Sequence, residues 1–477
     1  MRDGHESVPA RPGGSKKAIP VFRIFNHYLS LRIVVLTLLE TLVLFQAMVL
    51  GFQIRLAQYA VPMPLSQAGI FTLVMLVMMA ALGLYQPQAE PFRVTIQRLV
   101  VAYGLSLMVM SVVFYLFPET YVGRGVFALA SVFAVSGVLI IRLVFFRISD
   151  IGLPKRRVLV LGNGPEAEEA IRFLHGAMKG RTIQYAGLYP VLPDRQMQHS
   201  ERRIDHEHLL RTARDLRVSE IVIALRERRG GVLPLRQLLD CKLAGVKVMD
   251  LTSFYERELG VLKVDNLRAS WLIFGQGFEQ GFVRDMIKRS FDLIASLTLF
   301  IVTLPLLLFT ILVIFLESGR PVFYRQERVG QGGVPFTILK LRTMVQDAEC
   351  DGKPRWAGER DPRITRVGRF LRRFRIDELP QLINVLRGEM SFVGPRPERP
   401  FFVRHLVEDI PYYDVRHSVK PGITGWSQVR YQYGASLEDS MAKLQYDLYY
   451  VKNHSLFLDL LILIETVQVV LEGKGAR

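Results

Sequence analysis

The chain has 477 residues and a formal net charge of +17, from 61 Lys and Arg against 44 Asp and Glu. It is too long for one ordinary domain, and its positive charge favours an anionic partner such as nucleic acid, an anionic membrane surface or a phosphorylated substrate. Its two cysteines, Cys241 and Cys350, lie far apart and outside any CxxC spacing, which argues against a disulfide scaffold and a zinc site.

Four apolar stretches recur near the N-terminus, at residues 33–54, 65–85, 99–117 and 126–146. Each has about the 20 residues needed to cross a bilayer, whereas a secretory signal would be one short segment. We therefore predict that residues 1–150 form a region of four transmembrane helices. Glu40 lies inside the first stretch, and we expect it to face a neighbouring helix.

Basic residues flank these stretches unevenly. Those on one side are Arg11, Lys16, Lys17, Arg23, Arg32, Arg93, Arg98, Arg147, Lys155, Arg156 and Arg157. The two loops on the other side carry only Arg55 and Arg124. Because positively charged loops remain in the cytoplasm, the N-terminus and all residues after 147 are predicted to be cytoplasmic.

A second region opens with "RRVLVLGNGPEAEEAIRFL", which combines an apolar strand pattern, a glycine turn and a helical pattern. Gly162, Gly164 and the small Ala167 have the spacing of a Rossmann-type unit. The segments "SEIVIAL" and "VKVMDL" are further strand candidates, with helical patterns between them. We therefore predict a doubly wound, Rossmann-like α/β domain over residues 151–270.

Nucleotide binding by this domain is a separate question. The segment expected to carry the ribose-binding acid ends in Tyr189, Pro190 and Val191, and Asp194 follows only after a second proline. The sequence also lacks the Tyr-x-x-x-Lys pair required by nucleotide-sugar epimerases and dehydratases on this scaffold. These features favour a structural or regulatory domain, with an active dinucleotide site as the alternative.

A fifth apolar segment, residues 293–316, contains 24 uncharged residues, enough for another span. Basic residues flank it on both sides, namely Arg284, Lys288, Arg289, Arg320, Arg325 and Arg328. A spanning helix would carry the arginine-rich last third of the chain across the membrane, against the charge rule. We predict instead a re-entrant helix over 291–316 that enters and leaves on one face, with Pro305 supplying the break. A kinked ordinary span is the alternative.

The segment "RRFRIDELPQ" places two adjacent carboxylates, Asp377 and Glu378, directly after several arginines. Apolar residues at helical spacing precede and follow it, and Pro380 suits the first turn of the second helix. The pair is therefore predicted just before a helix N-terminus, where the helix dipole favours negative charge and phosphate alike. Both carboxylates can stay ionised only if cations or a metal ion lie close.

Downstream, Arg396 lies between Pro395 and Pro397, which restrict the backbone on both sides of it. A guanidinium held in this way can bind phosphate oxygens in a fixed geometry. Nucleic acid is the other anion suited to many arginines, but no helix-turn-helix, zinc finger or RNP-like motif accompanies them. A membrane-attached site for a diphosphate substrate fits these features better.

Five blocks follow one another between residues 288 and 460: "KRSFDLIASLTLFIVTLP", "PVFYRQERVGQGGVPFTILKLRTM", "RFRIDELPQLINVLRGEMSFVGPRPE", "KPGITGWSQV" and "YDLYYVKNHSLFLDL". Together they resemble the bacterial sugar transferase family, the monotopic polyprenyl-phosphate phosphoglycosyl transferases. The N-terminal half resembles the long form of that family, which is similar to undecaprenyl-phosphate glucose or galactose phosphotransferases. Leu341 departs from the family pattern, which has phenylalanine between the Lys and Arg of its "KFRTM" block.

This resemblance implies a mostly helical catalytic domain over residues 271–477. In the implied reaction, Asp377 attacks the β-phosphate of a UDP-sugar, releases UMP and holds the phosphosugar covalently. Polyprenyl (undecaprenyl) phosphate then accepts it, which gives a polyprenyl-diphosphate sugar and initiates exopolysaccharide, capsule or O-antigen synthesis. Such an enzyme is a polyprenyl-phosphate hexose-1-phosphate transferase of the bacterial inner membrane, and the long form is expected to be a homodimer.

The resemblance also implies roles for single residues. Glu378 would coordinate Mg²⁺, and Asp447 would add a second acidic group near the metal and the substrate. The candidates for phosphate contacts are Lys340, Arg342, Arg375 and Arg396. The apolar C-terminal segment is predicted to form an amphipathic helix on the membrane surface, or alternatively a core helix of the catalytic domain.

Two other classes of protein stay open on the sequence alone. One is a membrane-bound, NAD-dependent nucleotide-sugar dehydratase or epimerase, against which the missing Tyr-x-x-x-Lys pair argues. The other is a non-catalytic polysaccharide-assembly protein whose acidic pair has lost its activity. Only the intact motif around Asp377 and Glu378 argues against the second.

Overall fold

The computed structural model describes residues 21–24, 27–56, 65–85, 92–150, 155–176, 183–191, 208–225, 233–267, 272, 277–278, 281–346, 361–431, 434 and 436–471. Contacts group the described chain into two units. One lies within Leu139–Phe254, and the other within Phe22–Val138 together with Tyr255–Arg477. The sequence placed the start of the last domain at 271, whereas the structure joins the residues from Tyr255 onward to it.

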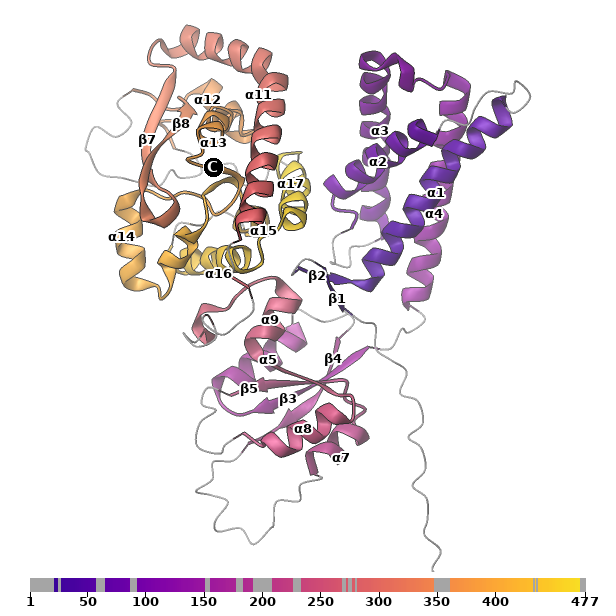
Figure 1. Ribbon diagram of the computed structural model, residues 1–477, viewed down its shortest axis with the longest axis vertical. Helices are drawn as coiled ribbons and strands as arrows, with labels where there is room; N and C mark the ends of the chain where they lie inside the picture. The colour runs from indigo at the N-terminus through magenta and orange to yellow at the C-terminus, as the bar shows by residue number, and fades with distance from the viewer. Residues whose placement is uncertain are drawn as a thin grey trace, which may run out of the picture. The chain divides into compact units, whose positions relative to one another are not determined.

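The N-terminal part of the chain forms a short hairpin and four apolar helices (Figure 1). These elements are β1 (Val21–Ile24), β2 (His27–Ser30), α1 (Leu31–Leu56), α2 (Leu65–Ala81), α3 (Phe92–Leu116), the short η2 (Pro118–Thr120) and α4 (Arg124–Asp150). Helices α1, α3 and α4 contain segments of 22 to 26 residues that are apolar enough to cross a membrane. Helix α2 has 17 residues, at the lower end of the spanning range. Four apolar helices were predicted here, and four are present.

Two charged side chains lie inside this helical region. Glu40 is fully buried and accepts a 2.6 Å hydrogen bond from the hydroxyl of Tyr85, which confirms that it faces inward. Arg142 of α4 is also buried, although the sequence did not single it out. Helices α1 and α4 approach closely at Gly51, where a methyl group would lie 2.9 Å from the backbone oxygen of Val126.

The α/β domain contains a four-stranded parallel sheet in the order β4-β3-β5-β6. Its elements are β3 (Arg156–Gly162), α5 (Pro165–Gly176), β4 (Ile183–Tyr189), α7 (His208–Asp215), β5 (Glu220–Ala224), α8 (Leu235–Leu243), β6 (Lys247–Asp250) and α9 (Leu251–Leu259). A parallel, helix-covered sheet was predicted and is present. Its second-first-third-fourth strand order is that of flavodoxin-like folds, whereas dinucleotide-binding Rossmann folds begin third-second-first.

The glycine turn of this domain serves packing. Gly162 has a φ of +152°, and a methyl group on it would lie 2.1 Å from the carbonyl oxygen of Ala224 in β5. Asn163 binds the end of the next strand, because its side-chain amide hydrogen-bonds the carbonyl of Val191. Glu166 and Glu168 occupy the first turn of α5, where a bound pyrophosphate would meet negative charge. These features favour the structural interpretation of the turn.

The C-terminal domain is mostly helical (Figure 1). Its elements are η3 (Val264–Asn266), α11 (Phe282–Ser318), β7 (Phe323–Val329), η4 (Gln331–Gly333), β8 (Pro335–Leu341), α12 (Arg366–Arg373), η5 (Ile376–Glu378), α13 (Gln381–Arg387), β9 (Ser391–Val393), α14 (Pro400–Asp409), η6 (Tyr413–Ser418), β10 (Gly422–Thr424), α15 (Trp426–Arg430), α16 (Leu437–Asn453) and α17 (Leu456–Leu471). β7 and β8 form an antiparallel hairpin, and β9 pairs with β10 in parallel.

The core of this domain gathers residues from both of its sequence ends. Leu262 and Val264 pack with Trp426 and with Leu448 of α16. Residues before 271 are tied in further because Glu256 accepts hydrogen bonds from Lys452 and Asn453, at 2.8 and 3.0 Å. In α17, Leu458 and Ile462 are fully buried in the same core, which agrees with the core-helix alternative for the C-terminal segment.

Helix α11 contains Pro305 and spans 37 residues, which would measure about 55 Å if the helix were straight. Figure 1 shows its ribbon changing direction before the chain enters β7. Near its start, Arg289 donates hydrogen bonds to the carbonyls of Val385 and Leu386 at 2.6 and 2.9 Å. At its end, the carbonyls of Ser318 and Gly319 accept hydrogen bonds from Arg342 at 2.7 and 2.8 Å. Both ends of the helix are therefore held by one domain.

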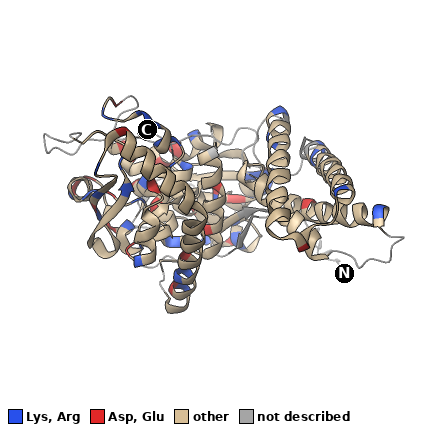
Figure 2. Cartoon of the chain, turned by 90° about the horizontal axis from the view of Figure 1, so that it is seen from above, with Lys and Arg blue, Asp and Glu red and all other residues tan. Residues whose placement is uncertain are grey.

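The middle of α11 is apolar and largely uncovered. Exposed side chains include Ile301, Val302, Phe309 and Leu316, between 60% and 73% accessible. In Figure 2 the long helices are tan over most of their length, which marks the scarcity of charge along them. The hydroxyl of Thr303, two residues before Pro305, donates a 2.7 Å hydrogen bond to the carbonyl of Leu299. An apolar environment around α11 is the simplest way to cover these side chains.

Candidate functional site

The acidic pair lies in a one-turn connection between two helices, as the sequence predicted. Helix α12 begins at a capping Thr365, whose hydroxyl accepts a 2.9 Å hydrogen bond from the backbone of Gly368. After α12, Arg375 adopts a left-handed conformation with a φ of 54° and turns the chain. Asp377 and Glu378 then occupy the turn η5, directly before α13.

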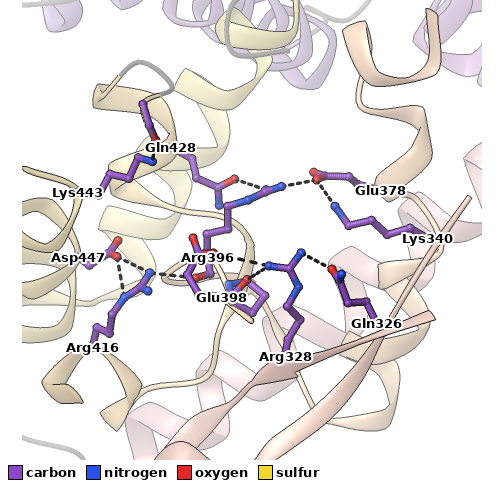
Figure 3. A network of polar contacts seen from close by, with 12 residues as sticks. Gln326, Arg328, Lys340, Glu378, Arg396, Glu398, Arg416, Gln428, Lys443 and Asp447 are labelled. Carbon is purple, nitrogen blue, oxygen red and sulfur yellow. Dashed lines mark hydrogen bonds and ion pairs between the residues drawn. The ribbon is translucent and has the colours of Figure 1, made fainter. Parts of the chain in front are cut away.

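Three cations surround Glu378. Its Oε1 atom lies 2.8 Å from Nζ of Lys340 and 3.0 Å from Nη2 of Arg396, and its Oε2 atom lies 3.3 Å from Nη1 of Arg375 (Figure 3). Burial by itself would raise the pKa of Glu378, but Lys340, Arg396 and Arg375 hold that pKa well below its ordinary value. The structure therefore brings together three of the four predicted phosphate-binding cations around one ionised carboxylate.

Asp377 has a different environment from its neighbour. It is 8% exposed, and among the described residues no hydrogen bond or ion pair engages its carboxylate. Burial and the adjacent Glu378 charge raise the pKa of Asp377, against the opposing effects of Lys340, Arg372 and Arg396. The pair thus consists of one carboxylate that three cations contact directly and one that cations influence only from a distance.

Arg396 is positioned by contacts on both sides of its side chain. Its Nη1 atom donates to Oε1 of Gln428 at 3.0 Å, while Nη2 reaches Glu378. Its backbone carbonyl accepts a 2.9 Å hydrogen bond from Arg416. The following Pro397 carbonyl accepts a 3.0 Å hydrogen bond from Arg328 of β7. The rigid presentation of Arg396 that its two prolines predicted is therefore reinforced by long-range hydrogen bonds.

Asp447 does not join the acidic pair. Its Oδ2 atom accepts hydrogen bonds from Nε and Nη2 of Arg416 at 3.1 and 2.7 Å, and its side chain is 1% exposed. Figure 3 shows this ion pair on the opposite side of Arg396 from Glu378. The structure therefore places Asp447 as the partner of Arg416, beneath the backbone of Arg396, and away from the predicted metal position.

Arg342 is also separated from the site. Arg342 directly follows the last residue of β8, and although strand alternation alone would put it on the same face as Lys340, its guanidinium is directed at the end of α11. The Nη2 atom of Arg342 binds the end of α11 through Ser318 and Gly319. Its predicted phosphate contact is thus replaced, in this structure, by a contact that fixes α11 to the end of β8.

Comparisons with known proteins agree with this architecture. Residues 283–473 match the family described as Bacterial sugar transferase. The uncharacterized sugar transferase EpsL of Bacillus subtilis is 44% identical over 196 residues, which make up 40% of this chain and 91% of that protein. The chain belongs to the bacterial sugar transferase family.

Two further relatives carry names that state a reaction. The UDP-glucose:undecaprenyl-phosphate glucose-1-phosphate transferase of Caulobacter vibrioides is 45% identical over 195 residues, 40% of this chain and 72% of that protein. The UDP-N-acetylgalactosamine-undecaprenyl-phosphate N-acetylgalactosaminephosphotransferase of Aeromonas hydrophila is 42% identical over 242 residues, 51% of this chain. The match spans only 56% of the Aeromonas protein.

Several residues that hold the site of this sugar transferase in place were not predicted from the sequence. Gln428 lies in the quoted block "KPGITGWSQV" and could have been found there. Asn384, which is fully buried, connects α13 to β8: it accepts from the backbone of Leu339 at 3.1 Å and donates to Thr337 at 2.8 Å. It thereby sets the strand that carries Lys340 against the helix that follows Glu378. No local sequence signal marks Arg416.

We expect Arg416→Met to destabilise this sugar transferase by about 3–5 kcal/mol, because Asp447 would remain buried without its cation. The double variant Arg416→Met/Asp447→Leu should recover most of this loss, since it removes both charges. Chemical denaturation followed by tryptophan fluorescence would measure the difference, because Trp426 lies in the same core. Equal stability of Arg416→Met and the wild type would contradict the assignment of this pair.

Proposed function

We propose that this sugar transferase transfers a sugar 1-phosphate from a UDP-sugar to undecaprenyl phosphate and releases UMP. The observation that carries the proposal is the asymmetry of the acidic pair: three cations engage Glu378, whereas Asp377 has no partner among the described residues. A carboxylate whose oxygens no cation contacts directly is free to attack phosphorus, and the cations nearby can bind the phosphates of a diphosphate. The reactions named for the Caulobacter and Aeromonas relatives support the substrate classes.

The proposed first step forms a bond between a carboxylate oxygen of Asp377 and the β-phosphorus of the UDP-sugar. The bond between that phosphorus and the bridging oxygen breaks, so the oxygen and its electron pair leave with UMP. In the second step, a phosphate oxygen of undecaprenyl phosphate attacks the same phosphorus and frees the carboxylate. The products are undecaprenyl-diphosphate sugar and the original enzyme, so the cycle needs no oxidant or reductant.

Lys340, Arg375 and Arg396 serve this step as phosphate-binding groups in the proposal. Without substrate they neutralise Glu378, and a diphosphate would share these donors. These cations would offset the negative charge of the bound diphosphate, which lowers its repulsion of the attacking Asp377 carboxylate. Fixed donors cost little reorganisation during the reaction, which is why the contacts that hold Arg396 matter for rate.

Glu378 is the residue that would hold Mg²⁺. Its Oε2 atom makes only the longer, 3.3 Å contact with Arg375, and Mg²⁺ commonly uses one or two carboxylates together with substrate phosphates and water. The described residues contain no group of three acidic, His or Cys side chains placed for a metal, so the substrate would supply the remaining ligands. When bound, the ion would withdraw charge from the diphosphate. Asp447 is engaged by Arg416 and is not part of this proposed set.

A UMP-release assay tests the proposal directly. The full chain in detergent would be incubated with a panel of UDP-sugars, with and without undecaprenyl phosphate. We expect one UDP-sugar to give at most one UMP per chain without the lipid and continuous release with it. Release of no UMP from any donor, or NAD binding accompanied by sugar oxidation, would instead favour a rival class.

We also propose that α11 is re-entrant, with the catalytic domain on the cytoplasmic face of the bacterial inner membrane. Support comes from the attachment of both helix ends to one domain, through Arg289 and Arg342, and from the exposed apolar middle of the helix. Basic residues flank both ends of α11, and the charge rule therefore places both ends on the same, cytoplasmic side of the membrane. In this arrangement the acidic pair works close to the lipid phosphate.

Cysteine labelling tests this topology in a chain whose two native cysteines are replaced by serine. We expect Ser290→Cys and Arg320→Cys to react with a membrane-impermeant maleimide from the same, cytoplasmic side. Arg320 is preferable to Gly319, because the φ of +68° at Gly319 disfavours any side chain. Tyr121→Cys, in the loop before α4, is the control and should label from the opposite side. Labelling of residues 290 and 320 from opposite sides would show a true span.

The central α/β domain is proposed to be dispensable for chemistry, since the family model matches residues 283–473, outside this domain, and a match of 196 residues covers 91% of EpsL. A chain that begins at Leu251 keeps the contacts of Glu256 with Lys452 and of Leu262 with Gln445. We expect it to retain UMP release within about tenfold, whereas a chain that begins at residue 271 should be less stable. Complete loss of activity in the folded, membrane-inserted longer fragment would show that the α/β domain contributes to catalysis.

A further inference from the structure

A second concave site lies on the C-terminal domain, beside the β7–β8 hairpin. It is an open cavity of about 790 Å³, bordered by both strands, the end of α13 and Lys420. Arg325 and Leu339 line it and pair with each other across the hairpin. Because strand side chains alternate between faces, these two project away from the face that carries Lys340 to Glu378. The cavity is thus separate from the acidic pair.

The cavity is strongly cationic. Arg325, Arg387 and Lys420 line it, and within the described part of the chain none of the three forms an ion pair. The single carboxylate in the lining is that of Glu389, which already accepts a 2.7 Å hydrogen bond from Asn384. Three cations against one engaged carboxylate leave a surplus of positive charge that an anion would neutralise.

A fourth cation adds to this surplus at the end of α13. A methyl group placed on Gly388 would lie 3.5 Å from Nη2 of Arg289 and 3.8 Å from Nζ of Lys420, so the two cations crowd one backbone position. Arg289 is directed at the carbonyls of Val385 and Leu386. Burial and the neighbouring Arg289 and Lys288 lower the pKa of Lys420, and the opposing effects of Asp292 and Asp285 do not cancel them.

One wall of the cavity is apolar. Val334 and Leu339 contribute to it, and Val334 is 65% exposed, whereas Phe336 borders the cavity from the other face of β8, where it packs with Ile338. A volume of several hundred cubic ångströms, with apolar side chains beside charged groups, lies in the size range of small-molecule sites. A simple inorganic anion would satisfy the cations but leave this wall uncovered.

We propose that this cavity is a second ligand site of the enzyme, which binds a phosphate-bearing molecule with an apolar portion. The phosphate would contact Arg325, Arg387 and Lys420, and the apolar portion would cover Val334 and Leu339. A nucleotide and a lipid headgroup with its acyl chains share this chemistry. An occupant would also contact β8, the strand whose Lys340 binds Glu378, so binding can alter the active site from the opposite face.

Equilibrium dialysis of the full chain in detergent tests the proposal with two probes, UMP and dioctanoyl phosphatidylglycerol. The charge reversal Arg325→Glu/Arg387→Glu should remove one bound probe per chain, and Arg396→Ala, at the proposed catalytic site, should remove a different one. If the site takes nucleotides, wild type binds two UMP and the charge-reversed variant binds one. If it takes lipid, the variant loses phosphatidylglycerol binding by at least tenfold and keeps its UMP stoichiometry.

Two controls separate a site from a general charge effect. The variant Arg325→Lys/Arg387→Lys keeps the charges and should retain binding, while Arg236→Glu/Arg404→Glu changes the net charge equally on other exposed surfaces and should bind as wild type. Binding of neither probe at the cavity, or equal losses in both charge-reversed variants, would overturn the proposal. The readout is the amount of probe lost on charge reversal relative to wild type, and this difference does not depend on whether the transferase reaction is correctly assigned.

Discussion

Asp377→Asn is expected to abolish the covalent phosphosugar adduct and to lower UMP release by at least about 10³-fold, because asparagine lacks the attacking charge. The substitution keeps the shape of the side chain, so Lys340, Arg375 and Arg396 can still engage Glu378. Loss of activity would then reflect chemistry at one oxygen atom and leave the phosphate-binding groups in place.

Intact-protein mass spectrometry measures this result in the presence of UDP-sugar and in the absence of lipid acceptor. Wild type should gain the mass of one phosphosugar, and Glu378→Gln should gain it slowly, with a steeper dependence on Mg²⁺ concentration. An adduct on Asp377→Asn at any Mg²⁺ concentration would assign the nucleophile to another residue. So would a wild-type adduct that peptide mapping places elsewhere.

Glu378→Gln is expected to destabilise the domain by about 3–5 kcal/mol, because it leaves three cations without their shared carboxylate. Asp377→Asn should have the opposite effect and raise the melting temperature, since it removes a buried charge that has no partner. Two neighbouring acids would therefore change stability in opposite directions. Thermal unfolding of both variants under the same detergent conditions measures the contrast.

The pH dependence of this contrast follows from the two pKa directions. The pKa of Glu378 is lowered in the folded state, so its ionised form contributes stability above the unfolded pKa of about 4.3, and that stability is lost as the pH falls. The pKa of Asp377 is raised, so the folded state binds its proton more tightly and its ionisation costs stability as the pH rises. As the pH falls, the loss of stability caused by Glu378→Gln should therefore become smaller, and the gain in stability caused by Asp377→Asn should become smaller as well. A deficit of Glu378→Gln that grew as the pH fell would contradict the ion-pair network.

The sequence predicted the local features of the site and missed its long-range contacts. Asp377 and Glu378 before a helix, and Arg396 between two prolines, follow from backbone rules that act over a few residues. The pairing of Arg416 with Asp447, 31 positions apart, depends on how η6 packs against α16. Arg342 matched a family block, yet its position at the end of α11 depends on a tertiary contact with Ser318.

For the fold as well, local elements were predicted from the sequence, whereas features that depend on long-range contacts were not. Apolar stretches and alternating strand patterns identified the N-terminal helices and the parallel sheet. Strand order was not predictable, because it depends on which side of β3 the later strands join. The attachment of Glu256 to Lys452 could not be predicted either, because it depends on a partner almost 200 residues away in the chain.

Because both ends of α11 are attached to one domain, a re-entrant α11, as proposed above, would give the catalytic unit a membrane anchor of its own. The depth of this unit in the bilayer would then be independent of the protein segment that precedes it in the chain. Gene fusions could then replace the N-terminal helices and the α/β domain without changing the position of Asp377 relative to the membrane surface. A match of 196 residues covers 91% of EpsL, about the length of the 283–473 family match, and a protein of that length is expected if such exchange has occurred.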